Sequence, residues 1–248
     1  MRKYFLVQGT FLLLAVSSLI AAEPDAREVV RKVDELYRSQ SSYAEMEMEI
    51  STPHWERTLR MKAWTQGTDR TFIRITAPAK EKGVATLRVG NEMWNYLPNT
   101  NKVIKIPPSM MMNSWMGSDF TNNDLVSEFT LLEDYNFELA RPDTARDDLL
   151  YIEAIPKEGK PIVWGKQIIQ VRKQDYIPVR QEYYSEDGEL MRVLLYRDIT
   201  RFDERRIPAE MVMLPQDEEG RTVIRYLDAE FNIEVQDEIF SLRNLRSG

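Results

Sequence analysis

Apolar and polar side chains alternate with a period of two residues along most of this chain. Between residues 43 and 51, Met46, Met48 and Ile50 form one row, and the positions between them are glutamates. Successive side chains of a β-strand point to opposite faces of the sheet. The segment is therefore typical of a strand with one apolar and one solvated face.

The same alternation recurs about a dozen times, at the spacing of antiparallel strands joined by short turns. Turn signals such as Gly67 and the Asp187–Gly188 pair separate most of the segments. No rhythm of strand, helix and strand is present, which argues against a nucleotide-binding α/β fold. The predicted fold class is mainly β (α+β), with antiparallel strands in a single domain. The predicted strands cover residues 43–51, 59–64, 72–76, 84–89, 92–97, 102–106, 149–155, 166–172, 179–184, 190–199, 209–214 and 222–231.

Two segments depart from this alternation. Residues 25–37 place apolar side chains at helical spacing behind Asp25, a suitable N-cap, and predict a helix whose apolar stripe covers the sheet. Alternation also stops between residues 107 and 127, where two prolines end the preceding strand. Short helical turns are expected after these prolines and again at residues 122–127.

The N-terminal residues have the order of a secretory signal. Arg2 and Lys3 precede an apolar stretch, which is followed by small residues up to Ala22. The apolar stretch is shorter than the roughly 20 residues that span a bilayer. No cysteine lies at the cut, so lipidation there is excluded. We therefore expect residues 1–22 to be a cleaved signal peptide and residues 23–248 to form one exported, periplasmic domain.

The charge and the absence of cysteine exclude several functions. The formal net charge is −7, and removing the two positive charges of the signal peptide changes it to −9. Nucleic acid requires clustered Lys and Arg, so an acidic chain without a basic block is not expected to bind it. With no cysteine in the chain, thiol chemistry, disulfides and cysteine-ligated metals are excluded.

Enzymatic signatures are scarce. The one histidine, His54, lies in a turn without the nucleophile that a general base would activate. The chain has no G-x-S-x-G elbow, G-x-G-x-x-G motif or P-loop. Oxygen ligands at residues 119–124 do not have the spacing of a calcium loop, and helix capping by Asp119 or Asn122 is the favoured role. We predict no enzymatic activity, no cofactor and no metal.

Methionine and tryptophan concentrate in the segment that interrupts the strands. Unbranched, polarizable methionines adapt to apolar ligands of varied shape, although a hydrophobic plug that completes the core would have the same composition. Methionines on the first two strands give a sheet a soft apolar lining. On the strand at 92–97, either Trp94 and Tyr96 or the alternate side chains could face inward. The candidate ligand-binding residues are Met46, Met48, Met61, Trp94, Tyr96, Met110, Met111, Met112, Trp115, Met116 and Phe120.

Four stretches together resemble the outer-membrane lipoprotein-sorting proteins, the family of LolA- and LolB-like periplasmic carriers. They are GVATLRVGNEMWNYLP at 83–98, VIKI at 103–106, MGSDFTNNDL at 116–125 and DEIFSLRNL at 237–245. The resemblance implies an unclosed antiparallel β half-barrel with short helices that cover a concave apolar face. The carrier holds its lid with a strand arginine. Here no arginine is matched to it, so that role is assigned to none of Arg57, Arg60, Arg70 and Arg74.

The resemblance implies a carrier of lipid or lipoprotein acyl chains toward the outer membrane. Its implied partners are the acyl chain itself and, transiently, an inner-membrane exporter and an outer-membrane acceptor. This chain is longer than the lipoprotein carrier, and longer members are associated with lipid exporters of the resistance-nodulation-division class, so a cargo other than lipoprotein stays open. The alternative is a periplasmic sensor or regulatory module that uses the same groove for a protein partner.

Overall fold

The computed structural model describes residues 23–37, 39–127, 131–160, 162–217 and 219–247. The predicted signal peptide lies outside the described residues.

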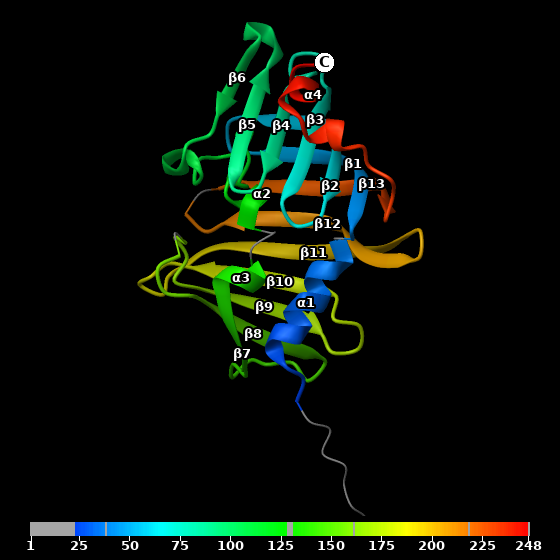
Figure 1. Ribbon diagram of the computed structural model, residues 1–248. Coiled ribbons are helices and arrows are strands. Elements are labelled where there is room, and N and C mark those ends of the chain that lie inside the picture. The colour runs from blue at the N-terminus through cyan, green and yellow to red at the C-terminus, as the bar shows by residue number, and fades with distance from the viewer. Residues whose placement is uncertain (1–22, 38, 128–130, 161, 218, 248) are drawn as a thin grey trace, which may run out of the picture.

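A single antiparallel sheet of 13 strands forms the body of the protein (Figure 1). The order of its strands is β6-β5-β4-β3-β2-β1-β13-β12-β11-β10-β9-β8-β7. Among the described residues β6 and β7 are the two ends of this order, so the sheet is an unclosed half-barrel and the predicted fold class is confirmed. The strands are β1 (Ser41–Ser51), β2 (Glu56–Gln66), β3 (Arg70–Ala77), β4 (Ala85–Val89), β5 (Glu92–Leu97), β6 (Lys102–Lys105), β7 (Tyr135–Ala140), β8 (Leu149–Pro156), β9 (Lys166–Arg172), β10 (Pro178–Tyr184), β11 (Leu190–Phe202), β12 (Arg205–Pro215) and β13 (Arg221–Phe231).

Pairing of β1 with β13 joins the first strands of the chain to the last. Every other neighbour in the sheet is also a neighbour in the sequence, so the half-barrel consists of two meanders that this one pairing unites. The strands turn through a large angle between β3–β6 and β7–β12, which gives the sheet its curvature (Figure 1).

Short helices lie over the sheet. The predicted N-terminal helix is present as α1, and its buried Val29 and Val30 pack on the strands β7–β9. Expected turns of helix within residues 107–127 are present as η2 and α2. The helices are α1 (Ala26–Tyr37), η1 (Pro98–Thr100), η2 (Pro108–Met110), α2 (Asp124–Ser127), α3 (Leu131–Asp134), η3 (Asp237–Phe240) and α4 (Leu242–Arg246).

The two faces of the sheet bury different clusters. On one face, which we call the cavity face, Met48 and Met61 of β1 and β2 belong to one large core cluster. On the other, which we call the outer face, Phe72, Leu87 and Tyr96 pack against the C-terminal segment. Arg74 secures this segment by donating from Nη2 to the carbonyl of Asn244 at 2.6 Å, and its own pKa is lowered by burial. The C-terminal turns therefore cover the part of the outer face formed by β2–β6, and the cavity face is covered by other elements.

Candidate functional site

A cavity of about 210 Å³ lies between the cavity face, helix α1 and residues 107–127. We call residues 107–127 the covering segment. The lining is mostly apolar and comes from α1, from the covering segment, from α3, and from strands on both sides of the β1–β13 pairing. Its apolar side chains include Val30, Val33, Met46, Met48, Met61, Ile73, Trp115, Phe120, Leu125, Leu131, Ile169, Leu194, Met211, Met213, Ile224 and Phe231.

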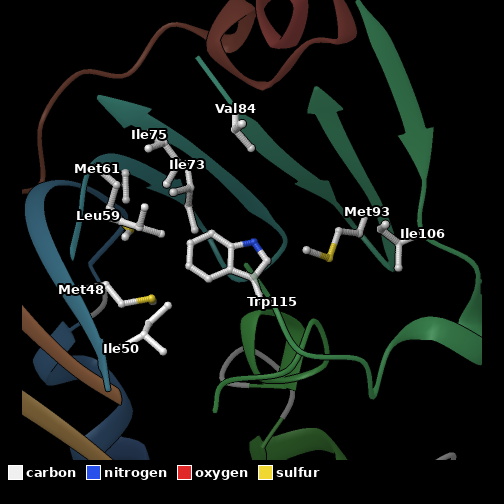
Figure 2. Close-up of a cluster of buried hydrophobic side chains, with 11 residues drawn as sticks. Met48, Ile50, Leu59, Met61, Ile73, Ile75, Val84, Met93, Ile106 and Trp115 are labelled. Carbon is white, nitrogen blue, oxygen red and sulfur yellow. The ribbon is translucent and has the colours of Figure 1, made fainter. Parts of the chain in front are cut away.

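Trp115 anchors the covering segment to the sheet. Its side chain is 3% exposed and belongs to the buried cluster that includes Met48, Met61 and Met93 (Figure 2). The indole Nε1–H donates to Thr86 Oγ1 at 3.1 Å, so the polar edge of the ring is satisfied inside the core. Trp115 thus completes the core and also forms part of the cavity wall.

A second attachment joins the covering segment to β13. The backbone amide of Asp119 donates to Thr222 Oγ1 at 2.9 Å, and that hydroxyl donates in turn to the Asp119 carboxylate at 2.7 Å. Thr222 is fully buried, so these bonds are shielded from water. Asp119 therefore attaches the segment to the sheet.

Helix capping, which the sequence predicted for Asp119 or Asn122, is performed by other residues. The backbone amide of Thr121 donates to the Asp124 carboxylate at 2.7 Å, and the amide of Asp124 donates to Thr121 Oγ1 at 3.1 Å, in the capping-box pattern.

A third attachment is a buried ion pair. Arg192 of β11 donates from both terminal nitrogens to the Asp124 carboxylate, at 2.8 and 2.5 Å. The guanidinium also stacks on Tyr183 and Trp164, with 4.2 and 4.6 Å to the ring centroids. Burial disfavours its charge, yet the adjacent carboxylate outweighs burial and the pKa of Arg192 is raised. The pair thus links the covering segment to a second strand of the meander that contains β13.

Arg57 of β2 holds the middle of the covering segment. Its Nη2 donates to the backbone carbonyl of Met116, and its Nη1 lies 3.8 Å from the Glu81 carboxylate. The guanidinium also lies over the ring of Trp55, 5.4 Å from the centroid. Of the four strand arginines that were assigned no role from the sequence, Arg57 is thus the one that forms a hydrogen bond to the covering segment within the described residues.

The cavity also has a polar strip, formed by hydrogen bonds that connect side chains of β11, β10, β9 and β7. Tyr196 donates to Gln181 Oε1 at 2.9 Å, Gln181 donates to Gln167 Oε1 at 2.6 Å, and Gln167 donates to the Tyr135 hydroxyl at 2.7 Å. Burial raises the pKa of Tyr135 well above its usual range, because the phenolate would lose its water. The chain of bonds fixes these side chains without presenting a charge to the cavity.

The predicted ligand-binding residues fall into three groups. Met46, Met48, Met61, Trp115 and Phe120 line the cavity. The other methionines of the covering segment do not line it, although two of them pack against the core cluster beside it. They are Met111 and Met116, which contact that cluster, Met112, which is half-buried, and Met110, which is 42% exposed.

Trp94 and Tyr96 lie on the outer face, in the cluster that the C-terminal segment covers. The alternate residue Met93 faces inward, against Trp115. This resolves the choice that alternation left open for β5. Met211 and Met213 of β12 also line the cavity and were not predicted, although their period-two spacing carried the same signal as that of β1.

Within the described ranges, no group of three or more His, Asp or Glu side chains could hold a metal ion. Over the same residues, no helix has both the length and the apolar character needed to cross a membrane.

The open half-barrel with a covered apolar face defines a class of fold that known structures share. A DUF1329 family protein from Desulfovibrio piger ATCC 29098 superposes with a TM-score of 0.80 at 23% identity, over 89% of this chain and 97% of that one. A structure described as an outer membrane lipoprotein-sorting protein domain, from Vibrio parahaemolyticus, gives 0.78 at 22% identity, over 89% and 98%. A LolA superfamily protein from Nitrosomonas europaea gives 0.75 at 22% identity, over 90% and 100%. The fold is therefore LolA-like.

Residues 67–247 match the sequence model of a family described as "-like: Uncharacterized protein", and the chain belongs to that family. None of the curated proteins compared with the chain matches it.

Proposed function

We propose that the protein is a periplasmic carrier that binds lipid or lipoprotein acyl chains in the cavity and transfers them toward the outer membrane. The observation that carries this proposal is the covered, methionine-lined cavity on one face of a LolA-like sheet. Such a site needs shape and apolar area more than specific polar contacts. No catalytic step is part of the proposal.

The energetics of chain burial support it. Each buried CH₂ group contributes about 0.8 kcal/mol, so a chain of about 16 carbons gains up to roughly 12 kcal/mol before entropy and reorganisation are subtracted. Methionines suit such a ligand because their flexible side chains follow a chain of any conformation.

The size of the cavity supports an opening step. Its 210 Å³ exceeds the roughly 150 Å³ that admits benzene, yet lies below the roughly 300–1,000 Å³ of pockets for larger ligands. A complete acyl chain therefore requires more space than the covered cavity offers. We propose that the covering segment moves outward to admit it and that the attachments through Asp119, Asp124 and Met116 close again afterward.

Native mass spectrometry of the protein purified gently from periplasm, followed by lipid extraction, tests the proposal. We expect a bound lipid in defined stoichiometry, and its identity separates lipoprotein cargo from other lipids. A protein that is empty and also refuses added lipids and lipopeptides would contradict the carrier. A stoichiometric protein partner found without lipid would point instead to a sensor or regulatory module that uses the same groove.

Uptake of a fluorescent lipid by variants tests the assigned wall. The double variant Met48→Ser/Met61→Ser places two hydroxyls in the apolar lining, and we expect it to lose at least tenfold in affinity. The matched control is Met110→Ser, because Met110 is exposed and does not line the cavity. Equal loss in both variants would show that the lipid binds elsewhere.

A further inference from the structure

Strand register places four polar residues side by side on the cavity face of strands β1–β4. Ser42 of β1 pairs with Thr65 of β2, Thr65 pairs with Thr71 of β3, and Thr71 pairs with Arg88 of β4. Paired residues on adjacent antiparallel strands have side chains on the same face, with Cβ atoms about 4.5–5.5 Å apart. We call Ser42, Thr65, Thr71 and Arg88 the polar row.

The row forms one end of the cavity. Ser42, Thr65 and Thr71 line it directly, and Arg88 stands beside Thr71. The next positions along the same strands are apolar, with Ala63 on β2 and Ile73 on β3. Along β2 and β3 the cavity wall thus changes from polar at the row to apolar beyond it, and the strip of Tyr196, Gln181 and Gln167 is a separate polar surface on β9–β11.

Burying the polar row lowers the stability of the fold unless a ligand forms hydrogen bonds with it. Thr71 is 6% exposed, and its hydroxyl has no hydrogen-bond partner among the described residues. A buried hydroxyl without a partner costs about 1–3 kcal/mol, so an empty cavity leaves this cost uncompensated. Ser42 and Thr65 share one hydrogen bond of 2.6 Å, which leaves one of their two hydroxyl hydrogens available to a third group.

Arg88 gives this end of the cavity its charge. The side chain is 2% exposed and donates from Nη1 to the carbonyl of Thr68 at 3.0 Å. Arginine stays protonated in proteins, so a positive charge is buried beside the donor hydroxyls. Asp34 and Asp124 also line the cavity. Asp124 is paired with Arg192, and neither of these carboxylates belongs to the polar row.

We propose that the polar row binds the anionic oxygen head group, carboxylate or phosphate, of an amphiphile whose acyl chain lies along the methionine-lined part of the cavity. This inference rests on the proposed carrier function and names the chemical class of its ligand. Thr71 donates one hydrogen bond to the head group, and the Ser42–Thr65 pair supplies a second. Arg88 supplies the positive potential.

Binding of three probes with the same chain tests the proposal: hexadecanoic acid, its glycerol monoester and hexadecyl phosphate, measured by displacement of a fluorescent lipid from the purified mature protein. We expect at least one of the two anionic probes to bind roughly tenfold more tightly than the neutral monoester. Preference for the phosphate assigns a phospholipid-type head group, and preference for the acid assigns a free fatty acid. Equal affinity for all three overturns the inference but leaves the carrier standing, whereas binding of none overturns the carrier as well.

The variant Thr71→Val removes the unpartnered hydroxyl and keeps the branched shape that strands favour. We expect the affinity for the preferred anionic probe to fall roughly tenfold, with the monoester unchanged and the thermal midpoint unchanged or raised, because an unsatisfied buried hydroxyl is removed. The matched control is Thr58→Val on the neighbouring strand β2. Thr58 pairs with Glu49 of β1, so its side chain lies on the outer face. A fall in thermal midpoint, or equal loss for anionic and neutral probes, would show that Thr71 is structural and would overturn its role.

Discussion

At the scale of single residues, Trp115 belongs both to the core and to the covering segment. Its ring fills the space between β1–β3 and β5, and Thr86 satisfies its indole nitrogen. The covering segment is therefore held by a side chain that is only 3% exposed. A segment that opens to admit a ligand must extract this ring or pivot around it.

We expect Trp115→Ala to lower the free energy of unfolding by about 3–5 kcal/mol, because it leaves a cavity in a close-packed cluster and the Thr86 hydroxyl loses a partner. Denaturant unfolding measures this loss. The control Trp55→Ala removes a tryptophan that is 44% exposed, and its effect should stay within about 0.5 kcal/mol. A loss below about 1 kcal/mol at Trp115 would mean that the covering segment is not part of the cooperative core.

Tyr135 makes the stability sensitive to alkaline pH. Its pKa is raised by burial, whereas in the unfolded chain it ionises near pH 10. Above that pH the unfolded state releases a proton that the folded state keeps, so stability is complete below about pH 10 and declines as pH rises further. We expect this group to contribute a slope of about 0.7 kcal/mol per pH unit at pH 10, rising toward about 1.4 near pH 11, and absent in Tyr135→Phe, when unfolding is measured at several pH values between about 9 and 11. Identical slopes in the two proteins would show that Tyr135 ionises while folded.

At the scale of elements, the attachments of the covering segment join residues that are far apart in the sequence. The Arg192–Asp124 pair spans 68 positions and the Asp119–Thr222 pair spans 103. Both meet because β11 and β13 lie near one another in the sheet, with β12 between them. The strands thus set the position of the segment, although its own sequence contains the aspartates.

We expect Asp124→Asn to loosen the covering segment, because the buried Arg192 charge loses its partner. Breaking one side of a buried ion pair costs about 3–5 kcal/mol. Hydrogen exchange of the amides in residues 107–127 should accelerate more than exchange in β8–β9, and uptake of lipid should become faster. The double variant Asp124→Leu/Arg192→Met should restore protection in part, since both charges are then removed.

A matched control for this prediction is Arg60→Gln, which breaks an ion pair with Glu47 on the exposed side of the same sheet. Exposed pairs contribute about 0–1 kcal/mol, so exchange should hardly change. Uniform acceleration over the whole sheet in Asp124→Asn would mean that the pair supports global stability and does not control the segment.

Much of the strand layout was predictable because alternation records the two faces of a sheet directly. Glu92–Leu97 and Lys166–Arg172 match their predicted bounds, but β7 was omitted although Tyr135, Phe137 and Leu139 alternate with polar residues. The alternation of apolar and polar residues does not reveal which segment of the chain packs on each face of the sheet. The placement of Trp94 depends on the C-terminal segment, which lies about 150 residues away along the chain.

The residues of the candidate site were predictable only where the sequence of a single strand or segment marks them. The methionines of β1 and β2 signal a soft apolar surface by composition alone, and they line the cavity. The polar row has no signature of this kind, because Ser42, Thr65, Thr71 and Arg88 are ordinary strand residues until register aligns them. Sequence periodicity gives the face of each residue, whereas register across strands requires the fold.

At the scale of the whole molecule, the cavity is built from both meanders. Met48 and Ile73 come from the first, Leu194 and Met213 from the second, and α1 crosses over the second. A ligand that fills the cavity therefore contacts both halves of the sheet at once. Its binding should couple to the unfolding of the complete fold and not to one hairpin.

A ligand that binds only the folded state stabilises it by about 2.7 kcal/mol when its concentration is a hundred times its Kd. For a chain of this size, about 2–4 °C of thermal midpoint corresponds to each kcal/mol. We expect a bound acyl lipid at that concentration to raise the midpoint by roughly 5–10 °C in a single transition, measured by calorimetry on delipidated protein. The Met48→Ser/Met61→Ser variant at the same lipid concentration should show a smaller rise, because fewer of its molecules are occupied. Tight binding with no change in midpoint would mean that the lipid binds the unfolded chain as tightly as the folded one. The cavity, which exists only in the folded protein, would then not be its binding site.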